Sequence, residues 1–129
     1  MQHVLLDLYG CDPTRLADQA ALHQLLATYP ARLGMEAVSP VSLHHISATS
    51  DPRDAGYSGF IIIATSHVSL HAWPPYGMLN LDLFSCEPFD TEAAVAAAVA
   101  AVLAQDVEIR VVERALRSPR AATRLLAVG

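Results

Sequence analysis

Hydroxyl, imidazole and thiol side chains gather near the middle of the chain, where their types and spacing could support nucleophilic and acid-base chemistry. The stretch SHVSLHAW begins at Ser66 and places His67 and His71 four residues apart. Polar and apolar residues alternate along it, which is typical of a half-buried strand. His67, Ser69 and His71 are therefore predicted to share one face of a sheet, with two imidazoles and a hydroxyl on the same surface.

A second alternating stretch, GMLNLDLFSC, ends at Cys86. Its leucines are predicted to face a core, whereas Asn80, Asp82 and Cys86 share the opposite face. A structural cysteine is usually buried among apolar neighbours and inert, so a place on the polar face favours a reactive role for Cys86. Histidines four residues apart suit a metal site on a helix, but this segment is strand-like and lacks a carboxylate motif. We therefore expect no metal site.

Composition narrows the range of partners. The chain has 129 residues, which predicts a single domain, and it combines 53% hydrophobic with only 16% charged residues. So apolar a composition in so small a domain favours a homo-oligomer, expected to be a homodimer, whose sites a partner subunit could complete. The net charge of −5 argues against nucleic acid and anionic lipid as partners.

The chain carries no segment typical of export or membrane insertion. Its start, MQHVLLDLYG, has no basic leader and does not predict a signal peptide. The longest apolar segment, 93–104, is too short to cross a bilayer, so we expect a cytoplasmic protein. Cys11 and Cys86 match no metal spacing and are expected to be thiols in a reducing compartment.

The period of the apolar residues changes along the chain and predicts the order β-α-β-β-β-β-α-β. A surface loop is expected at 47–57, where turn residues are dense. The fold class that this order predicts is α+β, a two-layer sandwich with one mainly antiparallel sheet and two helices packed on one face. Strands are expected at 3–9, at 35–46 with an interruption at Pro40, at 60–64 as a buried strand, and at 67–73, 76–86 and 107–112; the tail after Arg114 is unassigned.

Two helices are predicted between these strands. The first follows an N-cap candidate at Asp12 and ends at Gly34, and Pro30 disfavours its last turn. Its apolar stripe consists of Leu22, Leu25, Leu26, Tyr29 and Leu33. The second is Ala-rich and opens after Pro88 and Asp90. Its core-facing side is predicted to carry Val95, Val99, Val102 and Leu103.

These residues together resemble a known family. The run SGFIIIATSHVSLHAWPPYG, the later LDLFSC and the N-terminal HVLLDLYGCD are similar to the small prokaryotic S-adenosylmethionine decarboxylase proenzyme. The resemblance covers nearly the whole chain to Glu113, and the block SHVSLHAWP is distinctive. It implies a self-cleaving, pyruvoyl-dependent decarboxylase that acts on a small amino-acid substrate and feeds spermidine synthesis.

The resemblance also implies how the cofactor is made. Decarboxylation of an amino acid needs an electrophilic carbonyl, which no protein side chain provides. In the family, a serine attacks the carbonyl of the preceding peptide bond, and elimination and hydrolysis leave a pyruvoyl group on a new N-terminus. The matching residue is Ser66. Cleavage after Thr65 would give fragments 1–65 and 66–129.

Three further residues match assigned roles in the family. By resemblance, Ser58 hydrogen-bonds the developing oxyanion, and His71 removes the Cα proton during elimination. Cys86 matches the residue that returns a proton to the substrate carbon after CO2 leaves. Its predicted place on a polar face agrees with that role.

Other positions depart from the family pattern. Thr65 stands where the family has Glu, which affects the expected rate of processing. Pro75 replaces a Glu that binds the ribose hydroxyls, and Ile46 replaces an aromatic partner of the adenine; Trp73 remains as one stacking face. Losing such a hydrogen bond costs roughly 1.5 to 3 kcal/mol and losing such a stack roughly 1 to 3 kcal/mol. Weakened binding of S-adenosylmethionine is therefore expected.

Three functions follow as hypotheses. The first is decarboxylation of S-adenosylmethionine. The second is the same chemistry on L-ornithine or L-arginine, whose cation Asp51, Asp82 or Glu87 could meet. The third is a non-enzymatic partner subunit that never cleaves.

Overall fold

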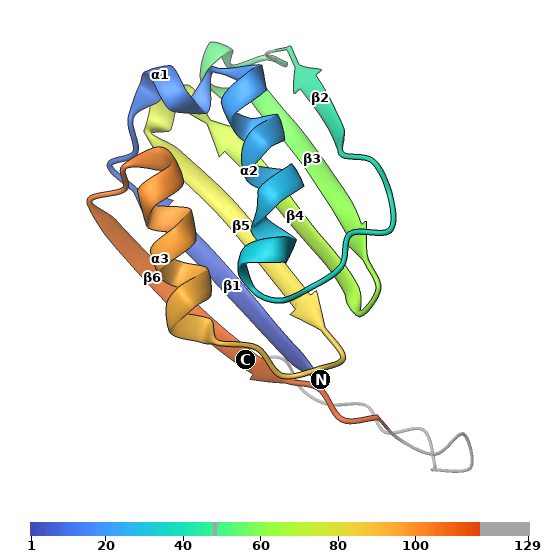
Figure 1. The fold of residues 1–129 in the computed structure, drawn as a ribbon. Helices are drawn as coiled ribbons and strands as arrows, with labels where there is room; N and C mark the ends of the chain where they lie inside the picture. Colours follow the sequence, from blue (N-terminus) through green and yellow to red (C-terminus); the bar gives the residue numbers. More distant parts are fainter. Residues whose placement is uncertain (48, 117–129) are drawn as a thin grey trace.

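The computed structural model describes residues 1–47 and 49–116. Strands, α-helices and short 3₁₀ turns follow one another along this part of the chain (Figure 1). The elements are β1 (Gln2–Tyr9), α1 (Pro13–Leu16), α2 (Gln19–Arg32), β2 (Ser42–Ile46), η1 (Pro52–Asp54), β3 (Gly56–Ile63), β4 (Ser66–Trp73), η2 (Pro74–Tyr76), β5 (Met78–Ser85), α3 (Thr91–Val102) and β6 (Asp106–Glu113).

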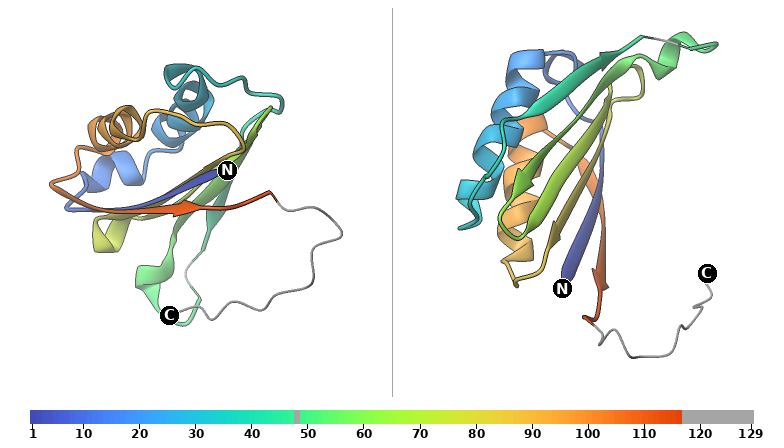
Figure 2. Two further views of the ribbon diagram at one scale, coloured as in Figure 1. Left: turned by 90° about the horizontal axis from the view of Figure 1, so that it is seen from below. Right: turned by 90° about the vertical axis from the view of Figure 1, so that its right-hand side faces the viewer.

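All of these strands belong to one sheet with the order β2-β3-β4-β5-β1-β6, and every neighbouring pair is antiparallel. The helices form a second layer on one side of the sheet (Figure 2). The predicted α+β two-layer sandwich is thus confirmed. We call the side of the sheet that points away from α2 and α3 the open face.

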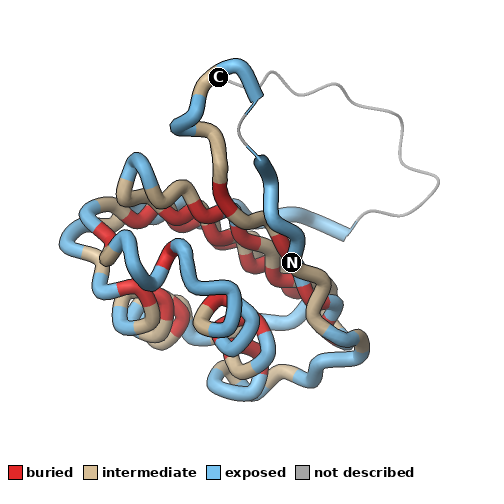
Figure 3. The backbone as a smooth tube through the Cα atoms, turned by 90° about the horizontal axis from the view of Figure 1, so that it is seen from above, coloured by how far each residue is buried: buried red, intermediate tan, exposed pale blue. Residues whose placement is uncertain are grey.

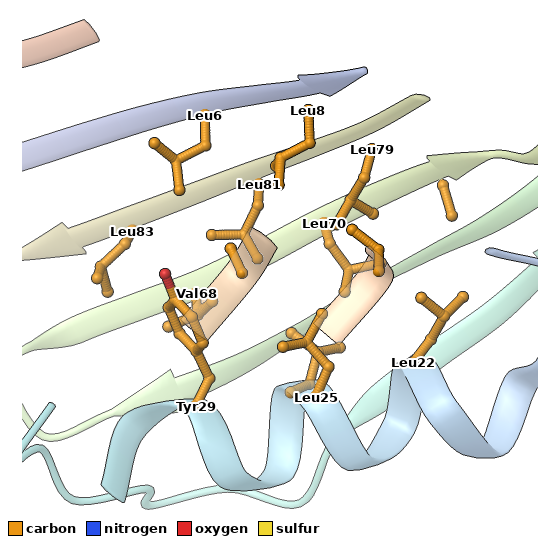
Figure 4. Packing of buried hydrophobic residues seen from close by; sticks show 14 of the residues in the cluster. Leu6, Leu8, Leu22, Leu25, Tyr29, Val68, Leu70, Leu79, Leu81 and Leu83 are labelled. Atoms are coloured by element: carbon orange, nitrogen blue, oxygen red, sulfur yellow. The ribbon is translucent and has the colours of Figure 1, made fainter. Parts of the chain in front are cut away.

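Side-chain alternation along the central strands builds the core between the two layers. The buried residues of the tube in Figure 3 lie where the sheet and the helices face each other. Because each buried leucine or valine contributes roughly 1.5 to 3 kcal/mol, this alternation fixes which face of each strand turns inward. Apolar strand residues that are at most 1% exposed on the helix side are Val4, Leu6, Leu8, Val68, Leu70, Leu79, Leu81 and Leu83. Figure 4 labels all of these except Val4.

The α2 helix presents the predicted stripe to this core. Its buried residues are Leu22, Leu25, Leu26, Tyr29 and Pro30, while Leu33 caps its C-terminus and is only partly buried. Pro30 does not break the helix, which continues to Arg32. A proline so close to the end removes few helical hydrogen bonds. Asp12 is an N-cap as predicted, but of the separate short helix α1, and Asp18 caps α2.

The predicted core side of α3 is confirmed for Val102, which is buried, and for Val95 and Val99, which are partly buried against the core, but it is wrong for Leu103. Ala94, Ala98 and Val102 are its buried residues, whereas Leu103 ends the helix at φ 52° and is 51% exposed. The prediction omitted Ala94 and Ala98, which are fully buried beside these valines. None of the helices in the described residues is long and apolar enough to cross a membrane.

Two strand predictions need correction. The strand expected at 35–46 exists only from Ser42 to Ile46, because Pro40 lacks the N–H for a ladder; Ala37 makes a single bridge to Ile63. The strand expected as buried at 60–64 runs from Gly56 to Ile63 and is buried on one side only. Phe60 and Ile62 are 44% and 40% exposed on the open face. The unassigned tail lies outside the described residues from position 117 onward.

Candidate active site

Strands β3 and β4 are joined by the tight turn that contains the predicted cleavage point. Ile63 pairs with Ser66, so Ala64 and Thr65 alone form the loop. Ser66 has φ 151°, a positive value that non-glycine residues rarely adopt. Such a conformation costs on the order of 1 to 3 kcal/mol and persists only where surrounding structure imposes it. The serine therefore begins β4 in a strained backbone.

Strand β5 supplies the contacts that impose this geometry. Ser66 pairs with Ser85 across the β4–β5 ladder. The backbone N–H of Cys86 donates a hydrogen bond of 2.9 Å to the carbonyl oxygen of Thr65. That carbonyl belongs to the Thr65–Ser66 peptide bond. A donor is thus already placed on the oxygen that would gain negative charge if the serine attacked.

Ser85 holds the same turn from the buried side. Its side chain is fully buried, and its hydroxyl donates to Thr65 Oγ1 over 3.0 Å. The same Oγ accepts a hydrogen bond of 3.1 Å from the backbone N–H of Glu87. We call Thr65, Ser66, Ser85 and Cys86 the turn cluster. The sequence reasoning missed Ser85, although its position in the leucine alternation of β5 predicts an inward side chain.

A second cluster lies further along the same hairpin. Ser58 and His71 are direct partners in the β3–β4 register, and Ser58 Oγ shares a hydrogen bond of 2.8 Å with His71 Nδ1. Trp73 and Ile46 line the same hollow as this pair, which has a volume of about 40 Å³. We call Ile46, Ser58, His71 and Trp73 the pocket cluster.

The two clusters are separated within one chain. His71 lies five residues beyond Ser66 on β4, which corresponds to roughly 16 Å at about 3.3 Å per residue. The structure therefore brings Ser66 together with Cys86, and Ser58 together with His71. It does not bring the Ser58–His71 pair to the Thr65 carbonyl of the same chain.

Of the three predicted substrate-binding residues, Trp73 and Ile46 lie together and Pro75 does not. Pro75 faces a neighbouring hollow of about 200 Å³, which His45 and Tyr57 also line. The hollow of the pocket cluster instead contains Asp54, a residue that the sequence reasoning missed. Asp54 lies in a segment dense in turn residues, and no periodic pattern there predicts which side chain points inward.

A chain of hydrogen bonds fixes the Trp73 indole on the open face. Its Nε1–H donates to Asn80 Oδ1 over 2.8 Å, and Asn80 Nδ2 donates to Asp7 Oδ1 over 2.6 Å. Arg110 completes the chain through a hydrogen bond of 2.9 Å to Asp7 Oδ2. Four neighbouring strands, β4, β5, β1 and β6, are linked in this way. The orientation of the indole is therefore set by the sheet itself.

Aromatic and imidazole rings cover the open face beside the turn cluster. His3 and His67 pack on the Phe84 ring, with centroids 5.4 and 5.9 Å away. Burial lowers the pKa of His3, an effect that the Asp82 carboxylate partly opposes. The Arg114 guanidinium lies 4.6 Å from the centre of the same Phe84 ring, and its charge also lowers the pKa of His3. Among the described residues, no group of three or more His, Cys, Asp or Glu side chains could hold a metal ion.

The turn cluster fits the pyruvoyl group that the sequence resemblance implies. Such a group would derive from Ser66, which stands next to a polarised carbonyl and within a strained backbone. Cys86 is an exposed free thiol one residue beyond the register partner of Ser66. By contrast, the hollow of about 340 Å³ between α2 and α3 contains no residue of either cluster.

Comparison with known proteins agrees with this arrangement. The S-adenosylmethionine decarboxylase family model matches residues 2–115. The S-adenosylmethionine decarboxylase proenzyme of Parasynechococcus marenigrum is 36% identical over 85 residues, which are 66% of this chain and 61% of that protein. The corresponding proenzyme of Pyrobaculum islandicum is 31% identical over 108 residues, which are 83% of this chain and 82% of that protein. The chain thus spans about three fifths of the length of the first of these relatives.

A solved structure shares the fold. The crystal structure of the adenosylmethionine decarboxylase from Aquifex aeolicus matches with a TM-score of 0.69 and 23% identity, over 95% of this chain and 96% of that one. The family match spans both clusters, from β1 to the end of β6. The chain therefore belongs to the S-adenosylmethionine decarboxylase family.

Proposed function

We propose that the chain is a self-processing, pyruvoyl-dependent decarboxylase of S-adenosylmethionine that feeds spermidine synthesis. The observation that carries the proposal is the hydrogen bond from the Cys86 N–H to the Thr65 carbonyl, directly before a strained Ser66. The names of the relatives favour S-adenosylmethionine over ornithine or arginine as the substrate.

Self-processing begins at the turn cluster. Ser66 Oγ adds to the carbonyl carbon of Thr65, and the negative charge develops on the oxygen that the Cys86 N–H contacts. The C–N bond then breaks, the amide nitrogen takes up the proton of the hydroxyl, and an ester links Thr65 to Ser66. Breaking the peptide bond also releases the backbone strain at Ser66.

Elimination completes the cleavage. Removal of the Ser66 Cα proton breaks the Cβ–Oγ bond and releases Thr65 as a carboxylate at the end of fragment 1–65. Hydrolysis of the remaining dehydroalanine releases ammonia and leaves a ketone at the start of fragment 66–129. That pyruvoyl ketone supplies the electron sink that decarboxylation needs. His71 is the base that removes the Cα proton in this elimination. During turnover, Cys86 delivers a proton to the substrate carbon after CO2 leaves.

The separation of the clusters supports a homodimer with composite sites. In this dimer the two open faces would stack on each other, related by a two-fold axis that runs across the strands. The pocket cluster of one protomer would then lie opposite the turn cluster of its partner. The open face carries the apolar side chains needed for such a contact, since Phe60, Ile62 and Val112 are 44%, 40% and 45% exposed. The hollow of about 40 Å³ is also far smaller than the roughly 300 Å³ or more of a typical ligand pocket. A second protomer would supply the missing walls.

Cleavage tests the proposal directly. In denaturing mass spectrometry, purified protein should give two fragments, one that ends at Thr65 and one that begins at position 66. Borohydride in the presence of an amine should trap the carbonyl on the second fragment. A single intact chain after long incubation would contradict the proposal and favour the uncleaved partner subunit.

Turnover tests the substrate. Release of labelled CO2 should be seen with S-adenosylmethionine when it is assayed beside L-ornithine and L-arginine. Release from ornithine or arginine alone would keep the chemistry and overturn the substrate. Size measurement by light scattering tests the homodimer, and a monomer that still cleaves would exclude composite sites.

A further inference from the structure

The hollow of the pocket cluster contains one acidic residue, Asp54, at the end of η1. We propose that Asp54 determines substrate specificity by accepting hydrogen bonds from the ribose hydroxyls of the nucleoside. This inference rests on the proposed function, because it assumes that S-adenosylmethionine enters this hollow. It assigns the recognition of hydroxyl groups to a loop residue outside the strands that carry the other site residues.

Asp54 reaches the hollow because the backbone passes very close to β4 two residues later, at Gly56, where only glycine fits. Gly56 follows two residues later and begins β3 against the carbonyl oxygen of Ala72, where any added Cβ would collide. This close approach seats the end of η1 beside Ser58, His71 and Trp73, which line the same hollow. Asp54 is half-buried there, whereas its neighbours Pro52 and Arg53 are exposed.

The Asp54 carboxylate keeps free acceptor capacity. Its Oδ2 accepts one hydrogen bond of 3.1 Å from Thr49 Oγ1. A carboxylate has about four acceptor positions, so most of them stay available. Within residues 1–47 and 49–116, Asp54 takes part in no ion pair.

The neighbouring cation makes its ion pair with Asp51, and the charge of Asp54 contributes less to the raised pKa of Arg53 than Asp51 does. Arg53 Nε donates to both carboxylate oxygens of Asp51 at 3.0 Å, and its guanidinium lies 5.7 Å from the centre of the Tyr76 ring. The hydrogen bonds to Asp51 and the contact with the Tyr76 ring together hold Arg53, the one arginine of η1. The loop thus satisfies Arg53 with Asp51 and leaves Asp54 for another donor.

The remaining walls fit a nucleoside. Ile46 and Trp73 present apolar surface, and the indole is fixed by its hydrogen bond to Asn80. A flat base can lie against such a wall while adjacent hydroxyls reach an acceptor. An anionic ligand would meet repulsion from the carboxylate. The expected ligand is therefore neutral or cationic, with a planar part and paired hydroxyl donors.

Binding and kinetics of the cleaved protein test this inference. Asp54→Ala should still cleave at the wild-type rate, but its KM for S-adenosylmethionine should rise about tenfold to a hundredfold with a smaller change in kcat. Calorimetric titration with methylthioadenosine, which has the ribose hydroxyls and no charge, should show a similar loss of affinity. Asp54→Asn keeps an acceptor oxygen and should lose less.

A double variant in the same loop is the matched control. Asp51→Asn with Arg53→Gln removes the neighbouring ion pair without changing the net charge, keeps a side-chain oxygen that can cap η1, and should keep KM within about twofold. An equal rise in KM in the control would assign the effect to loop structure and overturn the proposal. The proposal would also be overturned if Asp54→Ala bound methylthioadenosine with the wild-type affinity.

Failure of the proposed function would give a different result. In that case the wild-type chain would not cleave or release CO2. Titration of the uncleaved wild-type chain and of Asp54→Ala with methylthioadenosine would still test whether this carboxylate binds ribose hydroxyls, and equal affinities would reject it.

Discussion

The two ends of the β3–β4 hairpin hold their reactive groups in different ways. At the turn cluster, the backbone does most of the positioning, through the Cys86 N–H, the Thr65 carbonyl and the β4–β5 register. At the pocket cluster, side chains from β2, β3 and β4 converge, with Asp54 added from a loop. Every residue has a backbone carbonyl whatever its side chain, so the hydrogen bond from the Cys86 N–H does not require a particular side chain at position 65. Side-chain pockets have no such protection, because each wall of the hollow depends on the identity of its residue.

Replacement of the nucleophile has the largest expected effect, because it should abolish cleavage at the turn cluster and leave the pocket cluster unchanged. Ser66→Ala removes the hydroxyl that the proposed mechanism uses as the nucleophile, so cleavage should stop completely. Ser69→Ala on the same strand is the matched control and should give both fragments. Denaturing mass spectrometry measures the outcome, and two fragments from Ser66→Ala would refute the assignment of the cleavage site.

Removal of the thiol should separate positioning from proton transfer. Cys86→Ala keeps the backbone N–H and should cleave normally, while kcat should fall by roughly two to four orders of magnitude because a general acid is lost. Cys11→Ala is the control, because Cys11 lies in the core and burial raises the pKa of its thiol. The Cys11→Ala variant should keep its turnover. Unchanged turnover of Cys86→Ala would dismiss its role as proton donor.

Mixed chains test whether the two ends meet across a dimer. Ser66→Ala and His71→Ala should each remain uncleaved alone, because each lacks one half of every site. When the two are co-expressed, roughly half of the His71→Ala chains should be cleaved, since random pairing gives them an intact histidine from the partner. Distinct masses of the two variants identify which chain is cut. If no His71→Ala chain is cut, both clusters must act within one protomer.

The smallest effect is expected at the hydrogen-bonded network behind Trp73. Asn80→Ala removes the acceptor of the indole N–H and should raise KM about fivefold, because one hydrogen bond is worth on the order of 1 kcal/mol. Cleavage should proceed at the wild-type rate, since the turn cluster does not involve Asn80. Steady-state kinetics and the rate of fragment formation check both parts. A slower cleavage would show that the two ends of the hairpin are coupled.

Local patterns predicted most of the architecture. Alternation in GMLNLDLFSC fixed the inward leucines and the outward Asn80 and Asp82, and the structure confirms both faces. Periodicity was less precise for α3, where it correctly predicted Val102 but wrongly included Leu103 and omitted the two buried alanines, because an Ala-rich helix offers several sides of similar polarity. Packing of the helix against the rest of the core, which is a tertiary property, buries Ala94 and Ala98.

By itself, the sequence determined the order of the strands, the inward and outward faces of β4 and β5, and the family, because periodicity and short motifs are local properties of the chain. Only the tertiary structure placed the Cys86 N–H on the Thr65 carbonyl, separated the Ser58–His71 pair from Ser66, and seated Asp54 in the hollow. Each of these depends on strand register or on the path of a loop, which joins residues far apart in sequence. A two-residue period shows which way a side chain points but not which distant residue it will meet.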